Sequence, residues 1–129
     1  MATKVGIKRA YDDVQASDGY RVFVDRLWPR GVSKENLKFD AWCKDLAPSP
    51  ELRVWFGHKI ERWDEFKANY ETELRGPEQL IRMRDILAAA GKQPITLVYA
   101  AKDLEHNNAC VLAAELSRLT LAARKTASK

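Results

Sequence analysis

At 129 residues, the chain is long enough for one hydrophobic core and too short for two domains of ordinary size. Hydrophobic residues make up 46% and charged residues 31% of it, which excludes intrinsic disorder and fibrous structure for most of the chain. The 22 lysines and arginines exceed the 18 aspartates and glutamates, and this mildly basic balance is compatible with a phosphate-bearing partner, although a solvated basic tail explains part of it equally well.

The sequence has no pattern typical of export, membrane insertion or metal binding. Its first residues lack the apolar core of a secretory signal, and no apolar run approaches the length of a membrane span. Cys43 and Cys110 are far apart, and His58 and His106 are not in a metal-ligand spacing. We therefore expect a cytoplasmic protein with reduced thiols, no cofactor, no metal and no membrane partner.

The first part of the chain predicts two strands. Lys4 to Arg9 alternates apolar and polar residues, which is typical of a half-buried strand. The polar loop after it ends at Asp18-Gly19 and is short for a helical crossover, which favours an antiparallel arrangement with the next strand. Val22 to Val24 is apolar without alternation, and this pattern predicts a central strand that is covered on both faces.

The segment between this strand and the first helix contains a turn and an ambiguous stretch. Ser33 predicts a single capped turn. The stretch from Leu37 to Leu46 has apolar residues at alternate positions, namely Phe39, Ala41 and Cys43. This alternation favours a strand. The prolines of Ala47-Pro48-Ser49-Pro50 end it, because each disfavours helical geometry in the residue before it.

Breakers and apolar spacing predict three helices in succession. Ser49 before Pro50 predicts the start of a short helix that ends at Gly57. Apolar residues recur at three- and four-residue steps from Lys59 to Leu74, which predicts an amphipathic helix. A further helix is predicted from Pro77 as far as Gly91.

The last part of the chain predicts a strand and a helix. Ile95 to Ala101 is the most hydrophobic stretch and predicts a second central strand. Asn107 or Asn108 then caps a final helix, with an apolar stripe at Ala109, Leu112, Leu116, Leu119 and Ala123. Together these elements predict the α/β class: one domain over residues 1–129, ordered over about 4–122 with a polar, basic tail at 123–129, built as a small, mostly parallel sheet with helices packed against it.

Charged and polar residues follow both predicted central strands. If those strands are adjacent and parallel, these residues meet at the carboxyl edge of the sheet, where open α/β sheets bind their ligands. The first amides of the final helix attract phosphate or carboxylate, and an arginine can hold the same anion through two hydrogen bonds. We therefore expect a small phosphorylated or nucleotide-like anion at this edge; the candidate residues are Asp25, Arg26, Trp28, Arg30, Lys102, Asp103 and Asn107.

Several of these residues also have a purely structural interpretation. In the structural interpretation, Asp25 and Arg26 form an ion pair that locks the loop. In the functional one, Asp25 and Asp103 orient the arginines or act as a base. Trp28 packs in the core in one interpretation and stacks on a ligand in the other, whereas Trp42, Trp55 and Trp63 are assigned to the core.

Two weaker candidate sites lie elsewhere. Ser49 with Arg53 one turn later is a possible second anion cradle, although capping alone explains Ser49. Cys110 lies where a helix dipole can lower a thiol pKa, but without the Cys-x5-Arg spacing we expect a buried thiol. The chain has no P-loop, dinucleotide fingerprint or nucleophile elbow, so that no reaction is indicated and the question of an enzyme stays open.

Five segments resemble one known family: Arg21 to Gly31, Trp42 to Ser49, Leu52 to Phe56, Arg62 to Phe66, and Leu97 to Asp103 with Asn107. On these residues the sequence resembles the domain-of-unknown-function 488 family, in its YeaO-like branch, over about residues 4 to 119. The resemblance implies a small α/β domain with no established reaction. Lys44 lies in the second segment and joins the ligand-binding candidates, although Cys43 stands before it where a bulkier aliphatic residue is expected.

Other functions stay open at this point. Some members of the family are labelled winged-helix regulators, but the basic motif here follows a buried strand rather than forming a recognition helix. A nucleic-acid-associated protein would use the same arginines on backbone phosphates and Trp28 on an unpaired base. A protein-interaction module would use the Trp28 loop as a hot spot. The sequence does not indicate an oligomeric state.

Overall fold

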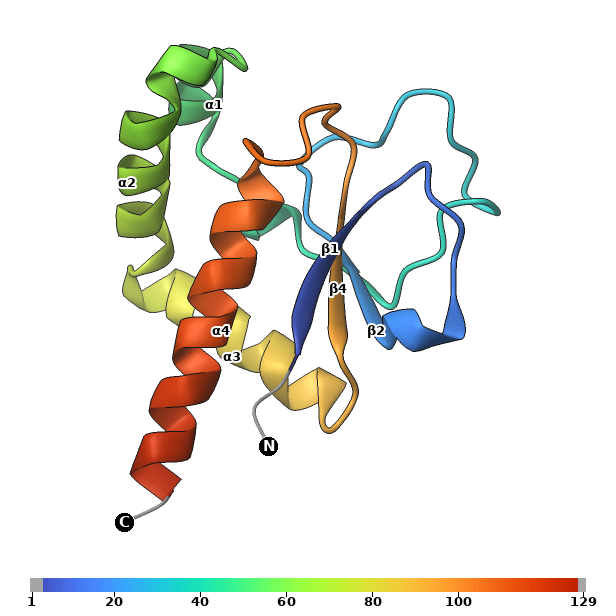
Figure 1. The fold of residues 1–129 in the computed structure, drawn as a ribbon, viewed down its shortest axis with the longest axis vertical. Helices are drawn as coiled ribbons and strands as arrows, with labels where there is room; N and C mark the ends of the chain where they lie inside the picture. The colour runs from blue at the N-terminus through green and yellow to red at the C-terminus, as the bar shows by residue number, and fades with distance from the viewer. Residues whose placement is uncertain (1–3, 128–129) are drawn as a thin grey trace.

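Four parallel strands form one sheet in the order β1-β4-β2-β3 within residues 4–127, the part of the chain that this computed structural model describes, with side chains as far as Leu121 (Figure 1). β1 spans Val5–Arg9, β2 Tyr20–Phe23, β3 Ala41–Trp42 and β4 Ile95–Tyr99. Leu97 of β4 lies opposite Ile7 on one side and Val22 on the other. The prediction that the two most apolar strands are adjacent and parallel is confirmed.

The predicted antiparallel arrangement of the first two strands is wrong. β1 and β2 are parallel and do not pair, because β4 lies between them. The connection between them needs no helix, since it returns over the sheet as a loop and a short 3-10 turn at Ala16–Asp18. Gly19 then enters β2 with φ of 68°, where a Cβ atom would lie 2.3 Å from the carbonyl oxygen of Pro94, so that only glycine fits.

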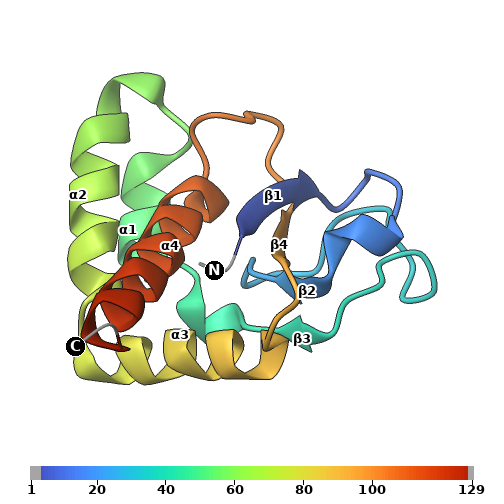
Figure 2. The same ribbon diagram turned by 60° about the horizontal axis from the view of Figure 1, so that its bottom comes forward.

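The helices pack mainly against one face of the sheet (Figure 2). They are α1 (Pro50–Phe56), α2 (Trp63–Leu74), α3 (Pro77–Ala90) and α4 (Asn108–Ala127). α1 begins and ends as predicted, since the Ser49 hydroxyl accepts the Leu52 N–H and Gly57 is left-handed. α2 starts later than predicted, after a 3-10 turn at Ile60–Arg62. The helical backbone of α4 continues to Ala127, but the side chain of Ala123 lies outside the described part and the behaviour of the tail stays a prediction.

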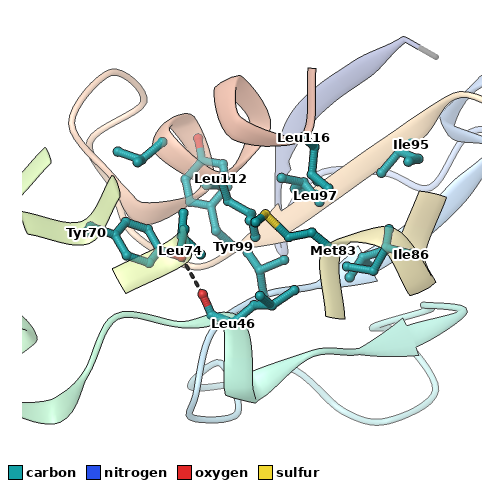
Figure 3. Close-up of a cluster of buried hydrophobic side chains, with 14 of the residues drawn as sticks. Leu46, Tyr70, Leu74, Met83, Ile86, Ile95, Leu97, Tyr99, Leu112 and Leu116 are labelled. Atoms are coloured by element: carbon teal, nitrogen blue, oxygen red, sulfur yellow. Dashed lines mark hydrogen bonds between the residues drawn. The ribbon is translucent and has the colours of Figure 1, made fainter. Parts of the chain in front are cut away.

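The larger hydrophobic core lies between the helices and the sheet (Figure 3). Alternate strand residues such as Val22, Leu97 and Tyr99 face this side and are essentially inaccessible to solvent. Tyr70 of α2 is fully buried among them, and its hydroxyl donates a hydrogen bond to the carbonyl oxygen of Leu46. Of the residues described, none belongs to a helix long and apolar enough to cross a membrane.

Loops rather than helices cover the opposite face of the sheet. Phe23 and Val98 pack there against Ala10 and Leu37. The strand predicted from Leu37 to Leu46 is mostly part of this cover: only Ala41–Trp42 pairs with β2, and Lys44–Leu46 forms a 3-10 turn. The ladder stops because its partner strand ends at Phe23. The Ser33 turn is confirmed, since the Ser33 hydroxyl accepts the N–H of Asn36.

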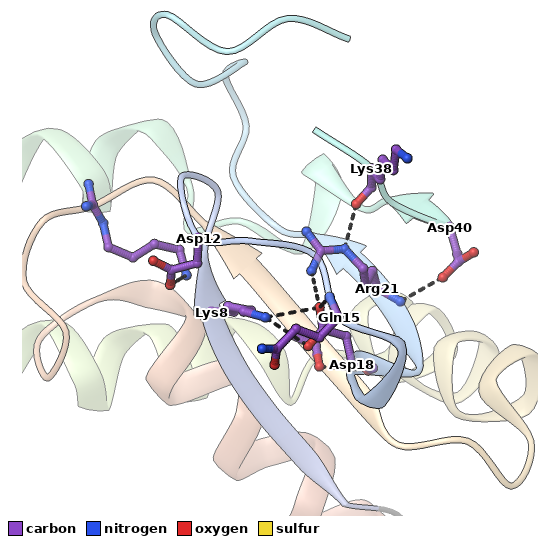
Figure 4. A network of polar contacts seen from close by, with 9 residues as sticks. Lys8, Asp12, Gln15, Asp18, Arg21, Lys38 and Asp40 are labelled. Carbon is purple, nitrogen blue, oxygen red and sulfur yellow. Dashed lines mark hydrogen bonds and ion pairs between the residues drawn. The ribbon is translucent and has the colours of Figure 1, made fainter. Parts of the chain in front are cut away.

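A buried polar network fixes the loop cover to the sheet (Figure 4). The carboxylate of Asp18 accepts hydrogen bonds from Lys8 Nζ at 3.1 Å, Arg21 Nη1 at 2.6 Å and the N–H of Gln15 at 3.0 Å. Arg21 Nε donates to the carbonyl oxygen of Lys38 at 2.7 Å. These bonds join β1, β2 and both loops, so that the network is structural. It is centred on Asp18 and Arg21, at the start of β2.

Candidate functional site

A pocket of about 340 Å³ lies where β2 and β4 end and α4 begins, at the strand ends that are uppermost in Figure 1. Its wall is formed by the loop after β2, from Asp25 to Arg30, and by Ala100 and Ala101 after β4. α1 and α2 contribute Phe56 and Phe66. The pocket is at the edge of the sheet that the strand pattern predicted, and its volume is in the range of sites for small ligands.

The structure brings some of the predicted site residues to this pocket and leaves others outside it. The residues that line it are Asp25, Arg26, Trp28, Arg30, Arg53 and Asn107. Lys44 instead lies with Nζ 5.1 Å from the centre of the Trp42 ring, and Ser49 lines a separate groove between α1 and α2. Lys102 is exposed, and Asp103 is occupied within its own turn.

Asp25 joins the ends of the two central strands. Its Oδ2 accepts the N–H of Ala100 at 2.8 Å, and its Oδ1 accepts a hydrogen bond from Nδ2 of Asn108, the first residue of α4, at 3.2 Å. Burial raises the pKa of Asp25 above its ordinary value, and these hydrogen bonds and the nearby His58 only partly offset the effect. The described residues include no ion pair between Asp25 and Arg26, so that the locking interpretation is not supported.

Three arginines from two separate segments line the pocket. Arg26 and Arg30 follow β2, and Arg53 is in α1. Within the described part of the chain, the side-chain ion pairs all involve other residues. Nε of Arg26 is buried and has no hydrogen-bond partner among the described residues. A buried donor without an acceptor is costly, and an oxygen of a bound anion would satisfy it.

Packing accounts for most of the Trp28 ring. Its Nε1 donates to the carbonyl oxygen of Val32 at 2.6 Å. The ring makes edge contacts with Phe23 and Trp42, at centroid distances of 6.0 and 5.6 Å. Trp28 therefore anchors the loop on the helix-free face, while part of it lines the pocket. Trp42, Trp55 and Trp63 are also half-buried and lie at the margins of the two cores.

The start of α4 is fixed by two polar side chains. Asn107 is buried and caps the helix: its Oδ1 accepts the N–H of Cys110 at 3.0 Å, and its Nδ2 donates to the carbonyl oxygen of Asp103 at 2.8 Å. The N–H of Glu105 and that of His106 hold the pKa of Asp103 below its ordinary value. Asp103 therefore shapes the loop before α4, and because it does not line the pocket, a role as a base there is not supported.

The Cys110 thiol is half-buried and donates a hydrogen bond to the carbonyl oxygen of Leu104 at 3.5 Å. Burial raises its pKa above the ordinary value. A thiolate activated by the helix dipole is therefore not supported, and the thiol that was expected to be buried is half-buried.

Sequence reasoning missed His58, Asn108 and Tyr11 as pocket residues. His58 follows the left-handed Gly57 and itself has a φ of 58°, which is unusual for a residue with a side chain. Tyr11 follows β1 and donates its hydroxyl hydrogen to the carbonyl oxygen of Arg30 at 2.9 Å. The wrong antiparallel prediction hid Tyr11, because it put the end of β1 at the opposite edge of the sheet.

Comparison with known proteins identifies the family. A family model described as "Inactive DUF488-N3 subclade" matches residues 4–129. This chain belongs to the DUF488 family. It is similar to uncharacterised protein YeaO of Escherichia coli K12, with 48% identity over 107 residues, which cover 82% of this chain and 90% of YeaO. It is also similar to uncharacterised protein Rv3073c of Mycobacterium tuberculosis H37Rv, with 41% identity over 111 residues, 86% and 92% of the two chains. No solved structure matches it significantly.

The expected membership of DUF488 and of its YeaO-like branch is therefore confirmed. The motif that carried this expectation, Asp25 to Gly31, contributes six consecutive residues to the pocket wall, from Asp25 to Arg30. The parallel four-stranded sheet also agrees with rejecting a winged-helix regulator for this DUF488 chain, since a β-wing is antiparallel.

Proposed function

We propose that this protein binds a small phosphorylated or nucleotide-like anion in the pocket at the carboxyl edge of its sheet, and that it acts in the cytoplasm. The observation that carries the proposal is the convergence of Arg26, Arg30 and Arg53 on one pocket, without an ion-pair partner among the described residues. Arg26 is half-buried, and a charge that is partly removed from water is normally paired. Arg30 and Arg53 are exposed and add positive charge beside it, which a bound anion would neutralise. The description of the matching family model as inactive favours binding without catalysis.

Three features of the pocket support a phosphate group as the anion. A guanidinium presents several N–H donors in one plane, which suits two phosphate oxygens at once. The first turn of α4 begins at the same wall, with Asn107 and Asn108, and adds backbone amides and the positive end of the helix dipole. Nε of Arg26 is an unsatisfied donor that needs an acceptor.

The apolar part of the wall supports a ligand larger than phosphate alone. Phe56 and Phe66 are buried residues that form part of it, together with Pro48. Such a surface suits the sugar or the ring of an organic phosphate. A protein that tracks a nucleic-acid backbone needs a long basic groove instead, whereas the arginines here meet at one pocket of about 340 Å³.

A thermal-shift screen tests this proposal, with inorganic phosphate, sugar phosphates, nucleotides and short single-stranded oligonucleotides as probes. We expect a phosphorylated small molecule to raise the melting temperature, because a ligand at a hundred times its Kd stabilises the native state by about 2.7 kcal/mol. Arg26→Ala and Arg30→Ala should lose the shift, and Arg30→Ala should keep nearly the same melting temperature without ligand. Arg84→Ala changes an exposed arginine that does not line the pocket and should keep the shift.

Two results would overturn the proposal. One is the absence of a shift with every phosphorylated small molecule. The other is a shift with oligonucleotides alone that fades steeply with salt, which would assign the same arginines to nucleic-acid phosphates.

A further inference from the structure

The pocket contains an anionic group as well as cations. The carboxylate of Asp25 lines it and is half-buried, yet no lysine or arginine among the described residues forms an ion pair with it. Its partners are neutral donors, the N–H of Ala100 and the amide of Asn108. A half-buried carboxylate without an ion-pair partner is stabilised by further hydrogen-bond donors.

Asp25 also has unused hydrogen-bonding capacity. Oδ2 accepts one hydrogen bond, from Ala100, and Oδ1 accepts one, from Asn108. An ionised carboxylate has about four acceptor positions, so that each oxygen can accept one more hydrogen bond. These two oxygens suit a ligand group that presents two N–H donors side by side.

The pocket therefore contains both a cationic and an anionic group with unused hydrogen-bonding capacity. The buried Nε of Arg26 needs an acceptor, with the exposed Arg30 and Arg53 lining the same pocket, and the Asp25 carboxylate has room for further donors. The apolar residues Phe56 and Phe66 belong to the same wall. A phosphate ester alone satisfies the arginines and places a second anion near Asp25, whereas a ligand that carries N–H donors at its other end satisfies both groups.

On the basis of the proposed phosphate site, we infer that the pocket selects a phosphorylated ligand whose other end is a planar ring with adjacent N–H donors. The Asp25 carboxylate accepts hydrogen bonds from both donors. Among the common nucleotides, guanine nucleotides have this chemistry, because guanine presents its ring N1–H and its 2-amino group side by side. Asp25 is then the residue that determines specificity, and the arginines supply the affinity for phosphate.

Titration calorimetry on the full chain tests the inference with GMP, IMP, AMP and ribose 5-phosphate. IMP lacks the 2-amino group, and AMP has a ring acceptor in place of N1–H. Because a hydrogen bond to a charged group contributes about 1.5–3 kcal/mol, each lost donor should weaken binding by at least about tenfold, in the order GMP, IMP, AMP. This ligand series needs no variant and cannot be confused with a folding defect.

Asp25→Asn supplies a sharper test. The asparagine amide keeps an oxygen for the N–H of Ala100 but replaces the oxygen that accepts from Asn108 with an NH2 donor. The Asn108 amide can turn so that its own oxygen accepts one hydrogen of this NH2, and the other hydrogen is left for a ligand. We expect the preference to move from GMP to XMP, which has a carbonyl in place of the 2-amino group, while ribose 5-phosphate binds as before. A merely structural role of Asp25 would weaken all these ligands together.

The outcomes separate the two proposals. If ribose 5-phosphate binds in an Arg26-dependent way but GMP, IMP and AMP bind equally, the inference about Asp25 is wrong and the phosphate site stands. If AMP binds more tightly than GMP, Asp25 does not accept hydrogen bonds from the ring, and the inference is wrong. If none of the phosphorylated compounds binds, both proposals are wrong.

Discussion

Asp18 is held ionised in a buried position by three donors. Burial alone would raise its pKa, but the N–H of Gln15 and the cations of Lys8 and Arg21 outweigh this effect and hold the pKa below its ordinary value of 3.8. Because the native pKa lies below the unfolded one, the carboxylate stabilises the native state at every pH above 3.8. That contribution is lost as the pH falls through the native pKa.

We therefore predict that Asp18→Asn lowers the free energy of unfolding by about 3 kcal/mol at pH 7, because it leaves the buried Arg21 without its anionic partner. Urea denaturation at a series of pH values measures the effect, and the difference from the native sequence should shrink below pH 3.8. Asp13→Asn is the control, since Asp13 is exposed and should show neither effect. A difference that does not depend on pH would show that the ionisation of Asp18 is not the cause.

At the scale of the elements, Ser49 connects two helices rather than holding a ligand. Its hydroxyl accepts the N–H of Leu52 at 3.3 Å and donates to Oε2 of Glu73 at 2.7 Å, while its own N–H donates to Oε1 of Glu73 at 2.9 Å. The neighbouring carboxylate repels an anion, so that the second cradle with Arg53 is not supported. Arg53 lines the main pocket instead.

Ser49→Ala should lower the free energy of unfolding by about 1 kcal/mol, the usual cost of losing an N-cap. It should leave any thermal shift by phosphorylated compounds unchanged, because Ser49 does not line the pocket with the arginines. Ser33→Ala is the matched control in an exposed turn and should cost less. Loss of the ligand shift in Ser49→Ala would move the anion site to the start of α1.

Local signals made the helices and the central strands predictable. Ser49-Pro50, Gly57 and Gly76-Pro77 mark helix ends through their own backbone preferences, and the apolar run from Ile95 needs no distant partner to indicate a buried strand. The direction of β1 was not predictable in this way. It depends on pairing with β4, which lies far along the chain and inserts between β1 and β2, and no local pattern reveals this.

The part of the candidate site that lies close together in the sequence was predictable, and the part that depends on tertiary packing was not. Asp25, Arg26 and Arg30 are close together in the sequence, and their position after a buried strand indicated the edge of the sheet. His58 and Phe66 reach the pocket only because α1 and α2 pack beside it, which is a property of the tertiary structure. Their own neighbours in sequence resemble those of any helix end or amphipathic helix.

On the scale of the whole molecule, the two faces of the sheet are covered differently. Helices and the larger core cover one face, and the chain from Val24 to Asp40 covers the other without regular secondary structure. The loop that carries Arg26 and Arg30 belongs to this second layer. The few backbone hydrogen bonds of this loop layer include those of the Ser33 turn and the one from the N–H of Asp40 to the carbonyl oxygen of Arg21.

We therefore predict that amide hydrogen exchange is slow in the central strands and faster in the loops that cover one face of the sheet. Amides of β2 and β4 should exchange only through global unfolding, whereas those from Arg26 to Phe39 should exchange faster, through local opening of the loop layer. Mass spectrometry of exchanged peptides measures both rates, and a bound phosphorylated ligand should slow the segment from Arg26 to Arg30 more than β4. Equal protection of both layers in the free protein would mean that the loop cover unfolds together with the core, and the arginines would then be held in place before any ligand binds.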